Sequence, residues 1–274
     1  MNLTEIIKNA FIFPSKNLET LSIFAILTLL SGAFLFQGIV TFIFGIIDIW
    51  NFVIGGIYIA ISIIMGLITR RISIQCIKSG IDLEEKMPDF NWFQSFGTGF
   101  SKVIITIFYF IIPTMIVIFI ALLTNIIGNI EYLIQALVLQ APNLIMSSSD
   151  VVTDAIYSAA LPLFLSLAIT ISLGLIIFLI FSFFQAMGEA RLAHTGSLKQ
   201  ALNIYGSAKD ISRIGVGKVI VLSVLLFIIV CIIEAILAVI FDHLLVLSIL
   251  TIITTPYLTL FGQRALGLLY SDIV

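Results

Sequence analysis

The positions of the basic residues constrain this chain more than any other feature of its sequence. The thirteen Lys and Arg residues fall into four groups, and long apolar segments separate the groups. They are Lys8 and Lys16; Arg70, Arg71, Lys78, Lys86 and Lys102; Arg191, Lys199, Lys209, Arg213 and Lys218; and Arg264. Lys and Arg accumulate on the cytoplasmic side of membrane proteins, whereas acidic residues contribute little to this bias. All thirteen can lie on one side of a membrane if the apolar segments cross it.

Three further connections contain no Lys or Arg. They hold Asp48, Glu131, Asp150, Asp154, Asp242 and His243. A helix needs about 20 apolar residues to cross the hydrocarbon core, and the segments between basic and non-basic connections reach that length. The sequence therefore predicts an all-α, polytopic helical membrane bundle of about six transmembrane helices, with both termini in the cytoplasm. The predicted spans are approximately residues 20–43, 50–69, 102–127, 159–187, 219–241 and 244–263, within a single integral membrane domain over residues 1–274.

The composition supports this class and excludes others. The chain is 61% apolar and 10% charged, whereas soluble domains carry about 25% charged residues. The basic residues are confined to connections and are not gathered into a groove, so we expect no nucleic-acid partner. The two cysteines, Cys76 and Cys231, are predicted to lie at the inner end of one span and inside another. They cannot pair, and we expect neither a metal site nor a cofactor.

Two segments are predicted to lie along the membrane surface. In residues 1–14, apolar residues recur at helical spacing, which predicts an N-terminal amphipathic helix on the inner surface. Pro14 is expected to end it. The apolar run that follows is too long for the core of a signal peptide, so we interpret it as a retained first span.

Residues 130–146 form a short apolar stretch, interpreted as an outer interfacial or re-entrant helix. The alternative, a seventh span, would distribute the basic groups over both membrane faces.

Two repeating patterns bear on helix packing. Small residues recur every four positions at Gly56 and Ala60, and again at Ser166, Thr170 and Gly174. This spacing lets helices approach closely, and internal packing is preferred over homodimerisation. The two basic loops also match at an offset of 116 residues. The matched pairs are Gly80 with Gly196, Gly99 with Gly215, and Lys102 with Lys218. A duplicated helical hairpin, with glycines at surface bends, would explain these pairs, but chance similarity in so apolar a sequence is an open alternative.

The same loops carry a resemblance to a known family. Met87-Pro88-Asp89-Phe90-Asn91-Trp92 with Gly99, the stretch from Ala190-Arg191 to Leu202, and the ending from Arg264 to Tyr270 resemble an uncharacterised family of archaeal and bacterial multi-pass membrane proteins. The likeness covers most of the chain. It implies a multi-pass fold in the plasma membrane, most readily of an archaeon. It supplies no active site, because the family's function is unknown.

Glu234 is the candidate functional residue. It is predicted to lie within the fifth span, where a charged side chain costs about 2.5–3.5 kcal/mol at the helix centre and commonly marks an ion or proton pathway. We hypothesise that Glu234 lines an outward-facing polar site with Asp242 and His243. Alternatively, Glu234 is protonated, bonded to a neighbouring helix or exposed to outer water. Interfacial anchors are predicted at Arg70, Arg71, Trp92, Lys102, Lys218 and Arg264.

The sequence favours a function without catalysis. We find no phosphate-binding glycine loop, no nucleophile elbow and no zinc-binding H-E-x-x-H motif. The preferred interpretation is a non-enzymatic membrane protein that organises lipid or docks a partner. A small transporter or channel subunit that uses Glu234 is the alternative, and a membrane enzyme ranks last. The lipid bilayer is the expected partner. A homo-oligomer, a membrane-protein partner and a small-molecule ligand are left open.

Overall fold

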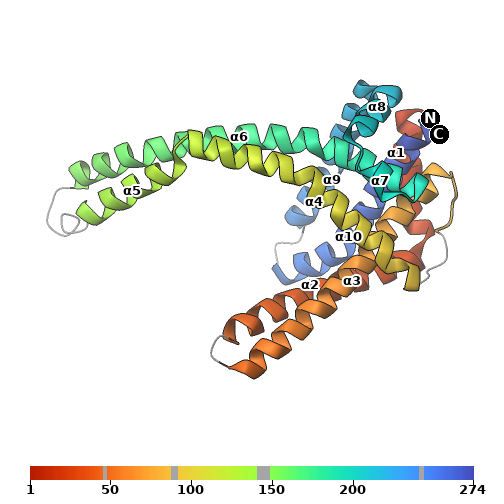
Figure 1. The fold of residues 1–274 in the computed structure, drawn as a ribbon, viewed down its shortest axis with the longest axis horizontal. Helices are drawn as coiled ribbons and strands as arrows, with labels where there is room; N and C mark the ends of the chain where they lie inside the picture. Colours follow the sequence, from red (N-terminus) through yellow and green to blue (C-terminus); the bar gives the residue numbers. More distant parts are fainter. Residues whose placement is uncertain (46–47, 88–91, 141–148, 241–243) are drawn as a thin grey trace. The chain divides into compact units, whose positions relative to one another are not determined.

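Helices are the only regular secondary structure among the described residues (Figure 1). The computed structural model describes residues 1–45, 48–87, 92–140, 149–240 and 244–274, and the side chains of all of these except residues 92–95, 140, 149–155, 240 and 244–250. The helices are α1 (Leu3–Lys16), α2 (Leu18–Phe44), α3 (Ile49–Ile81), α4 (Trp92–Leu123), α5 (Ile126–Gln140), α6 (Ser149–Thr195), α7 (Leu198–Ala201), α8 (Ile204–Ile214), α9 (Val216–Ile240) and α10 (Leu244–Tyr270), followed by the 3₁₀ helix η1 (Ser271–Ile273). The prediction of an all-α fold is confirmed for these residues.

Within the described residues, five helices are long and apolar enough to cross a membrane. The qualifying segments are Leu18–Phe44, Ile49–Ile81, Phe96–Leu123, Ile156–Thr195 and Val216–Val239. Large apolar side chains are exposed along them, including Phe36 at 71%, Trp50 at 72% and Phe227 at 69%. Monomeric soluble proteins rarely expose contiguous apolar surface on this scale, so the chain is a membrane protein. Helix α10, whose first seven residues have no described side chains, is not among the five.

The helices form two compact units. Unit 1 comprises residues 1–106 and 184–274, and unit 2 comprises residues 107–183. All thirteen Lys and Arg residues fall in unit 1. The basic groups identified in the sequence therefore belong to a single folding unit.

A tight helical hairpin, α2 with α3, forms one part of unit 1. Ser31 and Ser62 exchange hydrogen bonds, each hydroxyl donating to the other's carbonyl oxygen, at 3.0 and 2.7 Å. A methyl group on Gly55 would lie 2.6 Å from the Phe42 nitrogen. A methyl group on Gly56 would have no described atom of another helix within 4 Å. The prediction that Gly56 lies in an internal packing stripe is therefore wrong. The neighbouring Gly55 faces α2 instead, because a shift of one residue rotates a helical position by about 100°.

Helices α1 and α10 pack against this hairpin and complete the core of unit 1. The core cluster contains Phe13, Phe24, Ile68, Ile72, Cys76 and Leu260. Helices α3 and α10 cross where Gly80 meets Gly267, since a methyl group on Gly80 would lie 2.9 Å from the Gly267 Cα. Helix α1 buries Ile6, Ala10 and Phe13 and continues past Pro14 to Lys16. The Asn17 amide donates to the Phe13 carbonyl at 3.0 Å and so satisfies an acceptor near the helix end.

Unit 2 contains a hydrogen-bonded packing of α4, α5 and α6. Thr124 and Thr170 share a hydrogen bond at 3.1 Å, and the Asn129 amide donates to the Ser166 hydroxyl at 3.1 Å. Gly174 faces Val117, whose Cγ2 would lie 3.3 Å from an added methyl group. Internal packing of the stripe Ser166, Thr170 and Gly174 is confirmed. Helix α5, at 15 residues, is about 22 Å long and is shorter than the roughly 30 Å hydrocarbon core.

The glycines of the suggested repeat occupy two different backbone environments. Gly80 and Gly99 lie inside α3 and α4, where Gly80 meets α10 and Gly99 meets Leu67 of α3. Gly196 and Gly215 instead have positive φ angles of 66° and 100°, which glycine adopts without steric cost. The interpretation of all four as surface bends is therefore wrong for the first loop.

Candidate functional site

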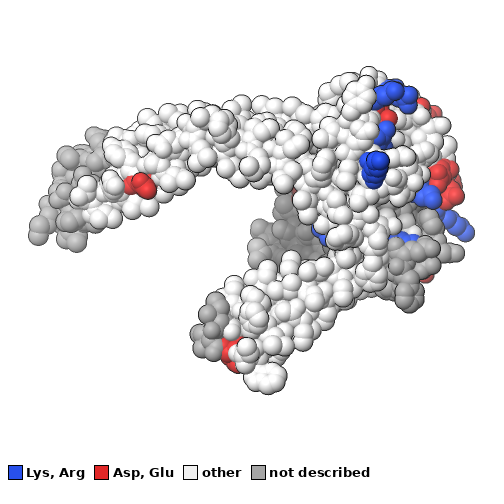
Figure 2. Space-filling view, viewed as in Figure 1, with Lys and Arg blue, Asp and Glu red and all other residues white. Residues whose placement is uncertain are grey.

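The buried polar groups of unit 1 gather where its two chain ends meet. We call this region the basic end and define it as residues 1–17, 70–87, 96–106, 184–218 and 264–274. Figure 2 shows Lys, Arg, Asp and Glu side chains concentrated there. In α2 and α3, by contrast, the sequence has no charged residue from 20 to 47 or from 49 to 69. Among its described residues, the basic end contains four clusters of buried or half-buried polar contacts and a cavity along α1.

The first cluster joins α4 to α6 through a buried ion pair. The Lys102 ammonium lies 3.0 Å from Glu189, and the two side chains are only 11% and 6% exposed. The Gln185 amide donates to Glu189 at 3.0 Å and to the Thr106 hydroxyl at 3.1 Å. Removing either charge would leave the other buried without a counter-charge, so this pair fixes α4 against α6.

The second cluster joins α6, α8 and α10. Arg191 Nε donates to Asp210 at 2.6 Å, and the Tyr270 hydroxyl donates to the same carboxylate oxygen at 3.0 Å. A methyl group on Gly206 would overlap the Arg191 guanidinium, so a larger residue there would require Arg191 to shift from its position beside Asp210. Burial and the nearby Asp210 carboxylate raise the pKa of Tyr270 to about 12. Tyr270 therefore remains protonated at neutral pH and acts as a hydrogen-bond donor.

The third cluster surrounds Arg264, which is 1% exposed. Its guanidinium lies 4.3 Å from the centre of the Phe13 ring and donates to the Ser79 hydroxyl at 3.0 Å. Ser79 lies in the last turn of α3, where the helix dipole favours a positive charge. Arg264 Nε has no hydrogen-bond partner among the described atoms. The residue thus joins α10, α3 and α1 at one point.

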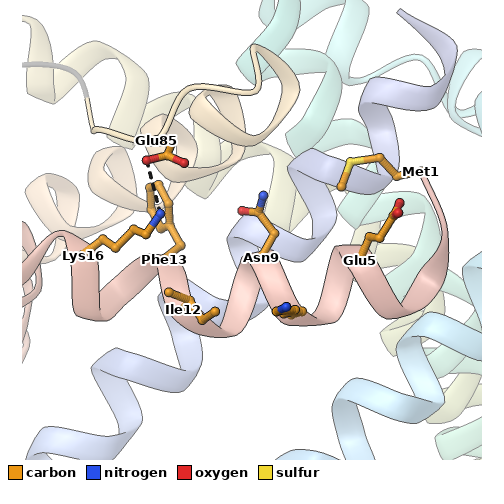
Figure 3. A pocket seen from close by; sticks show the side chains of 8 residues that line it. Met1, Glu5, Asn9, Ile12, Phe13, Lys16 and Glu85 are labelled. Carbon is orange, nitrogen blue, oxygen red and sulfur yellow. Dashed lines mark hydrogen bonds and ion pairs between the residues drawn. The ribbon is translucent and has the colours of Figure 1, made fainter.

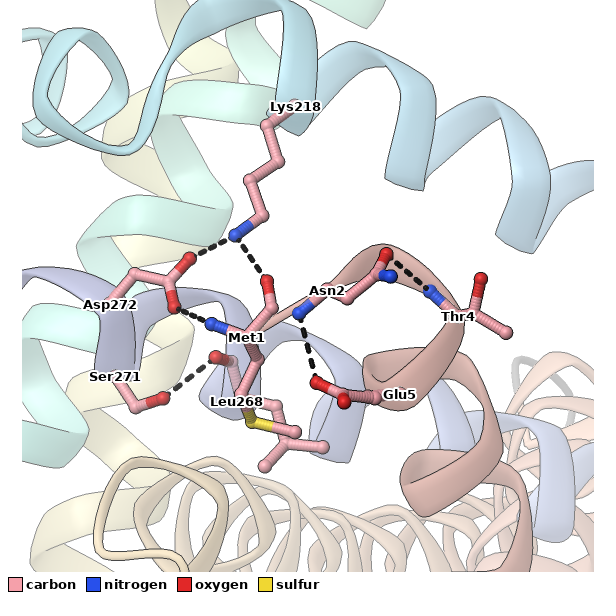
Figure 4. Close-up of polar contacts among 8 residues, drawn as sticks. All are labelled: Met1, Asn2, Thr4, Glu5, Lys218, Leu268, Ser271 and Asp272. Atoms are coloured by element: carbon pink, nitrogen blue, oxygen red, sulfur yellow. Dashed lines mark hydrogen bonds and ion pairs between the residues drawn. The ribbon is translucent and has the colours of Figure 1, made fainter.

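The fourth cluster ties the two chain ends together (Figure 4). Lys218 at the start of α9 pairs with Asp272 after α10, and Asp272 also accepts from the Met1 ammonium at 2.6 Å. Burial alone would raise the pKa of Asp272, but hydrogen bonds from Lys218 and Met1 hold it below the usual value. Lys102 and Lys218, matched in the suggested repeat, each pair with a carboxylate of a later helix, Glu189 in α6 and Asp272 in η1.

A cavity of about 390 Å³ lies along α1 (Figure 3). Its lining consists of Met1, Glu5, Lys8, Asn9, Ile12, Phe13, Lys16 and Glu85. Seven of these residues belong to α1 or precede it, and Glu85 reaches the cavity from the segment after α3. Lys16 pairs with Glu85 at 3.2 Å. This cavity was not anticipated from the sequence.

The predicted polar site around Glu234 stays a prediction. Glu234 lies in α9 with an exposed side chain. Asp242 and His243 lie outside the described residues, so the structure does not test whether they approach Glu234. Within the described part of the chain, no group of three or more His, Cys, Asp or Glu side chains could hold a metal ion.

The six predicted anchors occupy different environments. Arg70 is exposed, Arg71 and Arg264 are buried, and Lys102 and Lys218 are half-buried in ion pairs. Trp92 begins α4, but its side chain is not described. Their role as anchors at the membrane surface stays a prediction. The carboxylates that pair with Lys102, Arg191 and Lys218 were not predicted; they are Glu189, Asp210 and Asp272. Glu189 offered a signal, since it is the first charge after a long uncharged stretch that begins at Ala155.

One comparison with known proteins finds a family model that matches the chain. A family model described as a protein of unknown function (DUF4013) matches residues 54–241, which is more than half of the chain. This segment includes both basic loops and the ion pairs Lys102–Glu189 and Arg191–Asp210. No curated protein and no solved structure matches the chain.

Proposed function

The chain belongs to the DUF4013 family of proteins of unknown function, and from this starting point we propose that it is a non-enzymatic integral membrane protein that organises lipids of the inner leaflet. In this proposal it lies in the plasma membrane of an archaeon, spans it six times and keeps both termini in the cytoplasm. Helix α1 is the interfacial helix of the inner surface, and α5 lies at the outer surface. Lipid is its partner.

The proposed topology is supported by the placement of charge within the fold. Lys and Arg favour the cytoplasmic side, and the contacts of unit 1 join basic residues from distant parts of the chain at the basic end. Asp48, at the opposite end of the α2 and α3 hairpin, is exposed and has no basic residue near it in sequence. Helix α10 would form the sixth span, since it runs from Leu244 to Tyr270.

The proposed function rests on one observation, the division of the thirteen basic residues into two populations. Arg71, Lys102, Arg191, Lys218 and Arg264 are buried or half-buried, and each makes contacts inside the chain. The other eight are exposed: Lys8, Lys16, Arg70, Lys78, Lys86, Lys199, Lys209 and Arg213. An exposed Lys or Arg beside an anionic leaflet contributes about 1 kcal/mol of attraction. The buried population fixes the helices, and the exposed population is available to lipid headgroups.

The experiment compares spin-labelled lipids around the protein in reconstituted vesicles. We expect a larger motionally restricted fraction for phosphatidylglycerol than for phosphatidylcholine at low salt. The difference should shrink at about 1 M salt, where the Debye length is about 3 Å. Equal fractions for the two lipids at low salt would contradict the proposal. Solute flux that Glu234→Gln abolishes would favour transport in its place.

A further inference from the structure

We infer that the cavity along α1 is a binding site for the phosphate group of an inner-leaflet phospholipid. This inference rests on the proposed function and deepens it. The proposed function spreads the interaction with lipid headgroups over the whole basic end, whereas this inference assigns it one defined site on α1.

Helix geometry places two lysines on one face of α1. Lys8, Ile12 and Lys16 follow one another at intervals of four residues, so they lie on successive turns of the same face. The backbone positions of Lys8 and Lys16 are therefore about 12 Å apart along the helix axis. Ile12, which is 40% exposed, lies between them. The face combines the ammonium of Lys8, the ammonium of Lys16, which pairs with Glu85, and an apolar centre.

The carboxylates that line the cavity are already engaged. Glu5 accepts a hydrogen bond from the Asn2 backbone at 3.1 Å in the capping box of α1, and Glu85 pairs with Lys16 at 3.2 Å. Lys8 is exposed and belongs to no ion pair identified between described residues. The ammonium of Lys8 and the exposed amide of Asn9 therefore remain available as donors. An anionic oxygen accepts such charge-assisted bonds most strongly.

The contacts of α1 place this face beside the end of a predicted span. Phe11 packs edge-to-face on Tyr257 and Phe261 of α10, with ring centres 5.6 Å apart in both pairs. Phe13 lies under the guanidinium of Arg264. Phe261 and Arg264 lie at or just beyond the inner end of the predicted span 244–263, and Tyr257 lies about 9 Å inside it. The cavity is therefore at headgroup level, where a lipid phosphate lies and where an amphipathic helix binds through a basic polar face.

The test compares two double variants that remove the same charge from exposed positions. Binding of phosphatidylglycerol to the purified full-length protein would be followed by native mass spectrometry. We expect Lys8→Gln with Lys16→Gln to weaken binding by about fivefold for each lysine removed. The matched control is Lys199→Gln with Lys209→Gln, on α7 and α8, where both lysines are also exposed. The control should change this affinity by less than about twofold if the site is local.

The outcomes distinguish failure of the binding site along α1 from failure of the proposed lipid-organising function. Equal losses in the two double variants would overturn the site and leave a diffuse lipid interaction in place. Absence of any preference for anionic lipid in the wild-type protein would overturn both. Displacement of bound lipid by an excess of inorganic phosphate would show that the site takes a free anion and would overturn the lipid assignment. The single variant Lys8→Gln is the control for folding, because the Lys8 side chain is exposed. This variant must unfold at the same temperature as the wild-type protein.

Discussion

Gly267→Ala is expected to destabilise unit 1 strongly although it adds a single methyl group. The added carbon would overlap the carbonyl oxygen of Ile77 and lie 2.9 Å from the Cα of Gly80. Both neighbours are backbone atoms of α3, so relief requires α3 and α10 to move apart. Overpacking of this kind costs about 1–3 kcal/mol. The separation would also disturb Arg264, which reaches Ser79 from the preceding turn of α10.

A second glycine of α10 provides the matched control. Apart from its chain neighbours and the nearby backbone of α10, no described atom lies within 4 Å of the position that a methyl group on Gly262 would occupy. Gly262→Ala should therefore be neutral or stabilising, because alanine is favoured over glycine in helices by up to about 1 kcal/mol. Denaturant titration of the protein in mixed micelles, with helix content as the signal, measures both effects. Equal stability of the two variants would mean that α3 and α10 do not cross at Gly80 and Gly267.

Among single charge removals, breaking the pair between Lys102 and Glu189 should lower the stability of the protein most. Either Glu189→Met or Lys102→Met alone leaves one charge buried without its partner, which costs about 3–5 kcal/mol. The double variant replaces both charges by apolar side chains of similar length. Such replacements are often neutral or stabilising, so the double variant is expected to recover most of the stability lost in each single variant.

The double-mutant cycle gives the coupling free energy directly. The free energies of unfolding of the wild type, the two single variants and the double variant would be measured in the same micelles. A coupling of at least about 2 kcal/mol is expected for a buried pair that holds two helices together. Additive losses, with the double variant as unstable as the sum of the singles, would show that the two side chains do not interact.

The sequence predicts helices well here because membrane length and apolar composition leave few alternatives. The helices α2, α3 and α6 contain the predicted spans 20–43, 50–69 and 159–187 and extend beyond them. Hydropathy could not predict these extensions. They contain charged residues, and a charged residue marks the end of a span that is predicted from hydropathy. In α3 the extension contains Arg71 and Ser79, and burial rather than apolar character keeps it helical.

Packing contacts were harder to predict than helices. The stripe in α6 was identified correctly, since Ser166, Thr170 and Gly174 all face α4 or α5. Gly56 was chosen in place of its neighbour Gly55, because spacing alone does not give the rotation of a helix about its axis. The partners of the basic residues were missed for a related reason. Glu189 and Lys102 are far apart in sequence, and only the fold brings the ion pair together.

Labelling of single cysteines with a membrane-impermeant thiol reagent tests the six-span topology. The background would lack Cys76 and Cys231, and the probes would replace Asp48, Glu131, Glu85 and Tyr205, all of which are exposed. In intact cells the six-span topology predicts labelling at positions 48 and 131 and protection at 85 and 205 until the membrane is opened. Labelling at 205 in intact cells, together with protection at 85, would place the two basic loops on opposite sides and contradict the account.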